Sequence, residues 1–180
     1  TNLVDSIKTV IANEINDSNK VKSLLELSKQ YFDTNPQEAI RIATEAKDLG
    51  RRIGYQKGAA YGLKNIGIVY YYQGNYAEAI EIWKKSQSVF DSLGDKLGSA
   101  NILSNLGAIY YNIGDYNNAL DHYLRSLKIS EELKDTIRTV TVLLNIGAVY
   151  SDKLATQDKA LEYSKKALAL SEIIGYQEAI

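Results

Sequence analysis

Hydrophobic residues recur along the whole chain at intervals of three and four, which is the spacing of amphipathic helices. Near the start this pattern predicts a helix over residues 3–15. Further on it predicts helices arranged as antiparallel pairs, over residues 18–33 and 36–52, 57–73 and 76–92, 97–113 and 116–133, and 137–152 and 157–174. We therefore expect an all-α fold in which a single N-terminal helix precedes four helix pairs.

Polar residues and glycines mark the ends of these helices. Asp17 or Ser18 is expected to cap the helix that follows, because either side chain can accept hydrogen bonds from free amides of the first turn. Asn35 followed by Pro36 predicts a second helix start. The turns between or after the pairs contain Gly54, Gly94, Lys134 and Gly175. Lys134 is thus the one departure from glycine.

One six-residue segment occurs three times. It reads Asn-Ile-Gly-Ile-Val-Tyr over 65–70, Asn-Leu-Gly-Ala-Ile-Tyr over 105–110 and Asn-Ile-Gly-Ala-Val-Tyr over 145–150. The interval from one copy to the next is 40 residues both times. Recurrence of Asn, Gly and Tyr at one interval indicates a repeat protein, in which each helix pair is stabilised by stacking on its neighbours.

Composition and charge exclude several classes of function. The 180 residues are 45% hydrophobic and 24% charged, which is typical of a folded chain and excludes general disorder. Lys and Arg number 21 against 22 Asp and Glu, so no basic surface for nucleic acid is predicted. Cysteine is absent, and we find no apolar run near the roughly 18 residues that a membrane helix needs.

Motifs for catalysis, cofactors or metals were also not found. The chain has no glycine-rich phosphate loop, no candidate Ser-His-Asp set and no metal-ligand spacing. We therefore predict a chain that is not itself an enzyme and that uses no cofactor and no metal.

The helix pairs resemble the tetratricopeptide repeat, which has Leu-Gly-x-x-Tyr in its first helix and Ala-x-x-x-aromatic in its second. The second pair supplies Ile66, Gly67, Tyr70, Ala79, Trp83 and Ser86. The third supplies Leu106, Gly107, Tyr110, Ala119, Tyr123 and Ser126. The fourth supplies Ile146, Gly147, Tyr150, Ala160 and Ala167, with Ser164 where an aromatic residue is expected. The first pair is the most divergent, with Leu27, Ser28, Tyr31, Ala39, Ala43 and Ala46.

Two features depart from the family pattern. The usual repeat has about 34 residues, whereas this one has 40, and the family's helix-ending proline is missing. Longer helices account for both. An armadillo or HEAT array would share the period of 40 but would not require the Gly-x-x-Tyr and Ala-x-x-x-aromatic marks.

The resemblance implies a right-handed α-α superhelix whose concave surface is lined by the first helix of each pair. We expect one solenoid domain over residues 1–180, with a capping helix at 3–15 before the repeats. The repeats are expected at 18–57, 58–97, 98–137 and 138–178. Residues 175–180 echo residues 54–59, so residues 179–180 are expected to begin a fifth repeat and the native chain to continue.

Two stretches are similar to the tetratricopeptide sensor regions that precede bacterial histidine kinases, nucleotide cyclases and some transcription regulators. One runs from Asp17 through Pro36 to Ala39, and the other from Leu93 to Gly98. This similarity implies a sensory or scaffolding region of a larger bacterial signalling protein. No targeting segment is present, which leaves the cytoplasm and the periplasm open.

The candidate binding residues lie on the first helices. Asn65, Asn105 and Asn145 recur two positions before each repeated glycine, and a primary amide can both donate to and accept from a peptide backbone. In related families with the Asn-Leu-Gly motif, such as kinesin light chains, this asparagine contacts bound peptide. The alternative is that each asparagine only bridges neighbouring helices.

Aromatic and basic residues extend this candidate site. They are Tyr61, Lys64, Tyr71, Tyr72 and Tyr111, which are expected to contact a peptide ligand. The alternative for the tyrosines is packing within the repeats.

Three interpretations of function remain open. The first is a module that binds an extended protein or peptide segment in the concave groove. The second is the regulatory region of a multidomain enzyme, such as a cyclase or a histidine kinase. The third is a scaffold that self-associates through its open C-terminal end.

Overall fold

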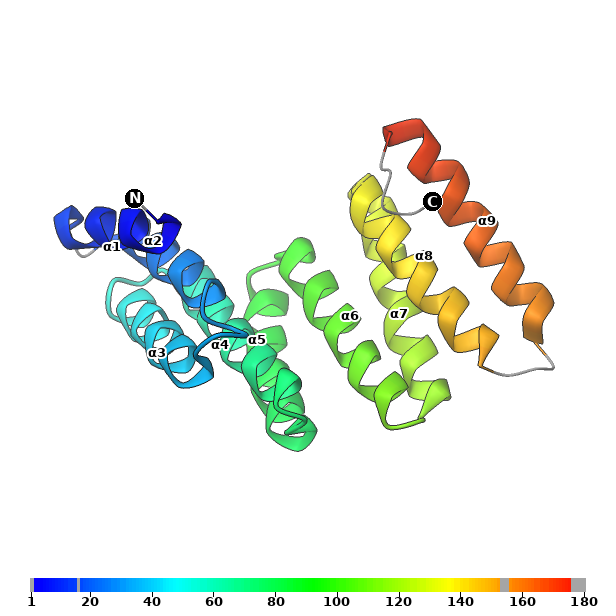
Figure 1. Ribbon diagram of the computed structural model, residues 1–180, viewed down its shortest axis with the longest axis horizontal. Coiled ribbons are helices and arrows are strands. Elements are labelled where there is room, and N and C mark those ends of the chain that lie inside the picture. The colour runs from blue at the N-terminus through cyan, green and yellow to red at the C-terminus, as the bar shows by residue number, and fades with distance from the viewer. Residues whose placement is uncertain (1, 16, 153–155, 176–180) are drawn as a thin grey trace. The chain divides into compact units, whose positions relative to one another are not determined.

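The computed structural model describes residues 2–15, 17–152 and 156–175, and within these ranges all regular secondary structure is helical (Figure 1). The helices are α1 (Leu3–Asn13), α2 (Ser18–Lys29), α3 (Pro36–Arg52), α4 (Gln56–Tyr72), α5 (Tyr76–Ser92), α6 (Lys96–Asn112), α7 (Tyr116–Glu132), α8 (Thr136–Ser151) and α9 (Gln157–Ile174). The all-α fold and its order of helices are therefore confirmed.

Two helices end earlier than the hydrophobic spacing predicted. The first ends at Asn13 instead of residue 15, because Glu14 already has an extended backbone. The second ends at Lys29 instead of residue 33. Beyond it, Tyr31 N–H donates to the Ser28 carbonyl and Phe32 N–H to the Lys29 carbonyl, which is the tighter bonding of a turn. Apolar side chains there keep a helical spacing although the α-helix has ended.

The polar caps lie where the sequence predicted them. Asp17, and not Ser18, caps α2, since its Oδ1 accepts hydrogen bonds from the amides of Asn19 at 2.8 Å and Lys20 at 3.2 Å. Asn35 Oδ1 likewise accepts from the Glu38 amide at 3.2 Å, with Pro36 as the first residue of α3.

The turns between pairs use a left-handed residue, and Lys134 adopts the same conformation as the glycines. Its φ is +56°, against +63° at Gly94 in the preceding turn between pairs. A side chain is rarely found in this region because its Cβ crowds the following carbonyl. The sequence position that breaks the glycine pattern is therefore also a position of backbone strain.

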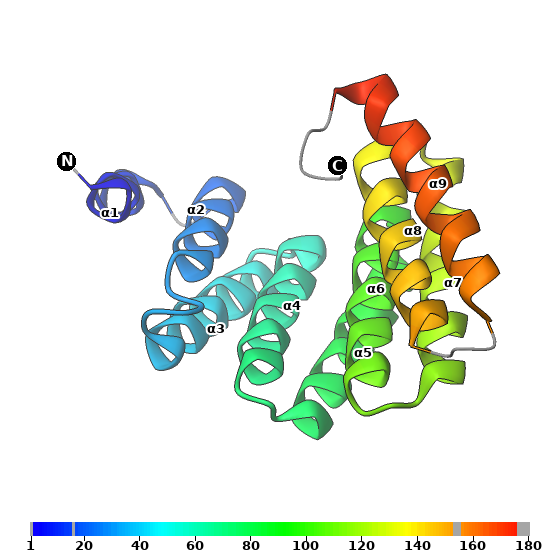
Figure 2. The same cartoon turned by 45° about the vertical axis from the view of Figure 1, so that its right-hand side comes forward.

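The contacts divide the chain into two compact units, Thr1–Asp95 and Lys96–Ile180, which we call unit 1 and unit 2. In unit 1, α2 to α5 pack in succession, and α1 lies on α2 through Val4, Ile7 and Ile11. In unit 2, α6 to α9 also pack in succession, as Figure 2 shows. A single domain and a fifth repeat stay predictions, and residues 176–180 lie outside the described residues.

Two of the three repeated glycines, Gly67 and Gly107, lie where the two helices of a pair approach closely. A Cβ at Gly107 of α6 would lie 2.7 Å from the ring of Tyr123 in α7, and one at Gly67 of α4 would meet the indole of Trp83 in α5. Real Cβ atoms do not approach other atoms so closely, so glycine is required at both crossings.

Buried serines add a hydrogen bond to these pairs. Ser86 Oγ donates to the Ala60 carbonyl at 2.8 Å, and Ser126 Oγ donates to the Ala100 carbonyl at 2.9 Å. Both hydroxyls are buried, so each bond satisfies a polar group inside the pair.

Candidate binding surface on the first helices

In unit 1 the asparagine of the repeated segment is an internal link. The side chain of Asn65 in α4 is 1% exposed, and its Nδ2 donates to the Leu25 carbonyl of α2 at 3.1 Å. It thereby joins the first helices of two consecutive pairs, which is the helix-bridging alternative that the sequence left open. This amide is occupied by the fold, and a ligand contact at Asn65 stays a prediction.

Tyr61 and Lys64 of α4 form a half-buried aromatic and cationic contact. The Tyr61 ring lies edge-on to Phe90 of α5, with ring centroids 4.9 Å apart. The Lys64 ammonium lies 5.4 Å from the centre of the Tyr61 ring, within the range of a cation–π contact.

The two tyrosines at the end of α4 differ in exposure. Tyr71 packs within the pair, with its ring centroid 5.9 Å from Tyr76 and 6.0 Å from Trp83. Tyr72 is 59% exposed and approaches Phe32 at 6.4 Å between centroids. Tyr72 is therefore the more available of the two for a ligand.

In unit 2 the asparagines have a different environment. Asn105 of α6 and Asn145 of α8 are both half-buried, and neither side chain makes a hydrogen bond to another described residue. Each amide can therefore offer two donors and an acceptor to a ligand.

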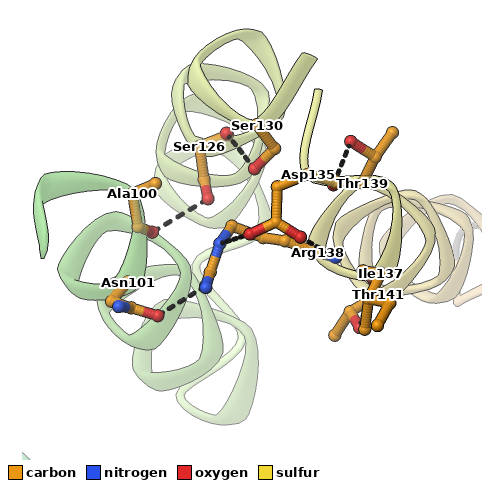
Figure 3. Close-up of polar contacts among 9 residues, drawn as sticks. All are labelled: Ala100, Asn101, Ser126, Ser130, Asp135, Ile137, Arg138, Thr139 and Thr141. Atoms are coloured by element: carbon orange, nitrogen blue, oxygen red, sulfur yellow. Dashed lines mark hydrogen bonds and ion pairs between the residues drawn. The ribbon is translucent and has the colours of Figure 1, made fainter. Parts of the chain in front are cut away.

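One polar link between α6 and α8 is built on Arg138, as Figure 3 shows. Its Nη1 donates to Asn101 Oδ1 of α6, and its Nε donates to Asp135 Oδ2 at 3.2 Å. Asp135 is the N-cap of α8, and its Oδ1 accepts the Arg138 amide hydrogen at 3.0 Å. The guanidinium is thus anchored both to its own helix start and to the neighbouring first helix.

A second polar link joins Tyr111 of α6 to Asp152, the C-cap of α8. A hydrogen bond with the Asp152 carboxylate, followed by partial burial and the negative charge, raises the pKa of Tyr111 above its ordinary value. The Tyr111 ring also packs on Tyr116, with centroids 5.9 Å apart.

Arg138, Asn145 and Asp152 follow one another at intervals of seven residues, so they share a face of α8. Two helical turns, roughly 10 Å, separate Asn145 from each of the others. Between the two polar links lie the half-exposed Leu144 and the exposed Ala148. We call the surface formed by Asn101, Asn105, Tyr111, Arg138, Leu144, Asn145, Ala148 and Asp152 the α6–α8 face.

Sequence reasoning selected Asn105, Tyr111 and Asn145 of this face and missed its other five residues. A signal for Arg138 and Asp152 existed, since each lies about two helical turns from Asn145 and at or near an end of α8. Which residues of α6 they contact depends on how α6 and α8 are rotated about their own axes. The hydrophobic periodicity of the sequence does not determine that rotation.

Several kinds of site were not found within the described ranges. No group of three or more His, Asp or Glu there could hold a metal ion. In the same part of the chain, no helix is both long and apolar enough to cross a membrane.

Comparisons with known proteins agree with this architecture. The family model of the tetratricopeptide repeat matches residues 56–132 and 98–173. No curated protein sequence matches the chain.

Solved structures show the same fold. Aspartyl phosphate phosphatase F from Bacillus subtilis aligns with a TM-score of 0.84 and 18% identity, over 95% of this chain and 45% of that one. MamA aligns with a TM-score of 0.64 and 23% identity, over 96% of this chain and 88% of that one. A Rap protein complexed with competence and sporulation factor aligns with a TM-score of 0.69 and 16% identity, over 97% of this chain and 52% of that one.

This chain thus spans less than half of phosphatase F, and at these identities the likeness concerns the fold alone. The family itself is shown by the repeat model, whose two matches together extend from residue 56 to residue 173. The chain belongs to the tetratricopeptide repeat family.

Proposed function

We propose that this chain is a non-catalytic protein-interaction module that binds an extended peptide segment on the α6–α8 face. The observation that carries the proposal is the pair of half-buried amides of Asn105 and Asn145, which no described residue engages. An extended peptide has unpaired backbone N–H and C=O groups along its length, and a primary amide can bond to both.

The rest of the face suits such a ligand. Leu144 is 38% exposed and Ala148 is exposed, so apolar side chains of a peptide can be covered there. Tyr111 adds an aromatic side chain of α6 to this face. Tyr61, Lys64, Tyr71 and Tyr72 lie in unit 1 and stay separate candidate contacts, and Tyr72 is 59% exposed.

We place this module in the sensory or scaffolding part of a larger bacterial signalling protein. The similarity of residues 17–39 and 93–98 to sensor regions supports this context. A solved Rap protein of the same fold is complexed with a competence and sporulation factor. The alternative is a regulatory region attached to a cyclase or histidine kinase.

Peptide selection followed by calorimetry tests the proposal. A library of random twelve-residue peptides is selected against the whole chain, and the affinity of each selected peptide is measured for the wild type, Asn105→Ala and Asn145→Ala. We expect each substitution to weaken binding by about 1–3 kcal/mol, or roughly one to two decades, because ligand backbone groups lose their partners.

Asn117→Ala is the matched control, since Asn117 is an exposed asparagine of α7, the second helix of its pair. It should bind selected peptides as the wild type does. Failure to select any peptide, or equal affinity for the wild type and both variants of the first helices, would refute the proposed function.

Self-association through α9 is a second candidate function. Leu161 is 55% exposed, Leu168 38% and Ile173 78%, so the last helix exposes apolar side chains. Sedimentation of the wild type and of Leu161→Lys at rising concentration tests it. A wild type that stays monomeric would exclude this function and would leave peptide binding untouched.

A further inference from the structure

An open cavity of about 230 Å³ lies in unit 2, where the turn from α7 to α8 lies beside α9. We call it the α7–α9 cavity. It is lined by Glu131 of α7, Lys134 of the turn, Thr136 and Thr139 of α8, and Leu170 of α9. None of these residues belongs to the α6–α8 face. A site here therefore does not depend on the proposed function.

Two opposite charges line this cavity without neutralising each other. No ion pair joins the Glu131 carboxylate to the Lys134 ammonium, so their charged atoms lie more than 4.0 Å apart. Neither group makes an ion pair or a side-chain hydrogen bond with another described residue. The charge of Glu131 also acts on Lys166 of α9, but that ammonium already pairs with Glu162 at 2.7 Å. Both charges of the cavity are therefore available to a ligand.

Two hydroxyls and one apolar side chain complete the lining. The Thr139 hydroxyl donates to the Asp135 carbonyl at 2.9 Å, so its oxygen can still accept a hydrogen bond (Figure 3). The half-buried Thr136 hydroxyl makes no hydrogen bond to a described residue and can both donate and accept. The half-buried Leu170 supplies an apolar wall. The cavity thus combines charged, polar and apolar groups within a small volume.

The backbone at Lys134 is strained, unlike that of the glycines at the corresponding turns. Gly94 and Gly54 lie 40 and 80 residues before it, and all three residues have a left-handed backbone, with φ of +56° at Lys134. A side chain is rarely found in this conformation, and strain of this kind is common where a side chain has a function. The strained residue is also the one that brings an ammonium group to the cavity.

The charges and the size of the cavity select the class of ligand. A simple anion would be repelled by Glu131 and a simple cation by Lys134, whereas a ligand with both charges can pair with both groups. The volume is below the roughly 300–1,000 Å³ of sites for drug-sized ligands. At about 30 Å³ for each water-sized atom it holds roughly eight non-hydrogen atoms, which is the size of valine.

We infer that the α7–α9 cavity binds a free α-amino acid with a small apolar side chain. The ammonium group of the ligand donates to the Glu131 carboxylate and the Thr139 oxygen. The carboxylate of the ligand accepts from the Lys134 ammonium and the Thr136 hydroxyl. Its apolar side chain packs on Leu170. One small molecule can reach both charges, because an α-amino acid carries its ammonium and carboxylate groups on the same carbon.

Calorimetric titration of the whole chain tests this inference. The probes are L-valine, L-leucine and L-isoleucine, each titrated separately up to about 10 mM. The amino acid that binds most tightly is then compared with its amide, which lacks the carboxylate, and with its N-acetyl derivative, which lacks the ammonium group. The proteins are the wild type, Glu131→Gln, Lys134→Gln, Lys134→Gly and Lys84→Gln. Lys84 is the matched control, since it is an exposed lysine of α5 in unit 1.

The wild type should bind the free amino acid at least about tenfold more tightly than either derivative, because each derivative loses one charge-assisted contact. Lys134→Gln should bind the amino acid and its amide equally. Glu131→Gln should bind the amino acid and its N-acetyl derivative equally. Lys84→Gln should behave as the wild type.

Lys134→Gly separates loss of the ligand contact from loss of the fold. It removes the ammonium group and also relieves the strained backbone, so it should bind the amino acid as weakly as Lys134→Gln does and yet melt at a higher temperature than the wild type. Opposite changes in binding and stability cannot come from unfolding.

Three outcomes would overturn the inference. They are absence of binding of all three amino acids by the wild type, equal affinity of the wild type for the amino acid and both derivatives, and unchanged discrimination in both Glu131→Gln and Lys134→Gln. Each of these outcomes leaves peptide binding on the α6–α8 face as it stands, because the two sites share no residue.

Discussion

The repeated segments of α4 and α8 differ at only one of their six positions, Ile68 against Ala148, and yet have different surroundings. In α4, Asn65 is fully buried and bonded to Leu25 of α2, and a Cβ at Gly67 would meet the indole of Trp83. In α8, Asn145 is half-buried without a bond to a described residue, and a Cβ at Gly147 would find Ser164 Oγ at 3.3 Å.

The difference shows that the role of a repeated residue is decided by its partners. Trp83 fills the crossing beside Gly67, whereas the smaller Ser164 leaves room beside Gly147. A carbonyl of α2 engages Asn65, whereas no described residue engages the amide of Asn145. The same sequence segment therefore stabilises the interior in α4 and contributes to a surface in α8.

The largest expected effect comes from adding a methyl group at the two glycines. Gly67→Ala should lower the free energy of unfolding by about 3 kcal/mol, because the buried indole of Trp83 has no space to move. Gly147→Ala should raise it by about 0.5 kcal/mol, because alanine is the better helix former and the hydroxyl of Ser164 can rotate away. Urea unfolding followed by circular dichroism measures both. Shifts of the same sign would contradict the packing difference.

The next largest expected effect is a difference in stability between alanine substitutions of Asn65 and Asn145. Asn65→Ala leaves the Leu25 carbonyl without its partner inside unit 1, so it should cost about 2 kcal/mol of stability. Asn145→Ala removes no hydrogen bond to a described residue and should change stability by less than about 0.5 kcal/mol. Urea unfolding followed by circular dichroism measures the stability of both variants. Equal losses would mean that Asn145 is also an internal link.

The turns that precede α4 and α8 can be exchanged. Lys134→Gly should stabilise the chain by about 1 kcal/mol, because it relieves the strain of a side chain at φ +56°. Gly54→Lys should destabilise by a similar amount, since Gly54 has φ +75° and nothing within 4 Å of its would-be Cβ, so the cost is that of the backbone alone. Thermal melting of the two variants checks this. A destabilised Lys134→Gly would show that the lysine side chain makes a stabilising contact.

The smallest expected effect is a pH dependence of stability, which comes from Tyr111 on the α6–α8 face. The neutral phenol of Tyr111 bonds to the Asp152 carboxylate, and its pKa is raised. The stabilisation is therefore fully present below the ordinary tyrosine pKa of about 10 and is lost as the pH rises through the raised value. Tyr111→Phe should be less stable than the wild type by a few tenths of a kcal/mol at pH 8, because solvent reaches the exposed Asp152 and screens its interaction with the half-buried Tyr111. The difference between the two proteins should shrink as the pH rises through the raised pKa of Tyr111. If the difference in stability between the two proteins stayed constant with pH, it would come from packing and not from ionisation of the phenol.

Sequence patterns predicted the helix order, a cap at Asp17 or Ser18, the Asn35-Pro36 start and the departure from glycine at Lys134. These depend on residues near in sequence, whose preferences act locally. The bond from Asn65 to Leu25 joins residues 40 apart, and the serine bonds to Ala60 and Ala100 join residues 26 apart. To predict such bonds, one must know how two helices are rotated relative to each other. The hydrophobic spacing of either helix alone does not determine this.

Trp83 gives this molecule an internal optical probe. It is the only tryptophan in the chain, its side chain is 1% exposed, and its Nε1 donates to the Lys64 carbonyl at 3.0 Å. Indole emission should therefore shift to longer wavelength when unit 1, which contains Trp83, opens. Comparing this signal with the far-ultraviolet ellipticity, to which all helices contribute, shows whether the two units melt in one cooperative step or in two.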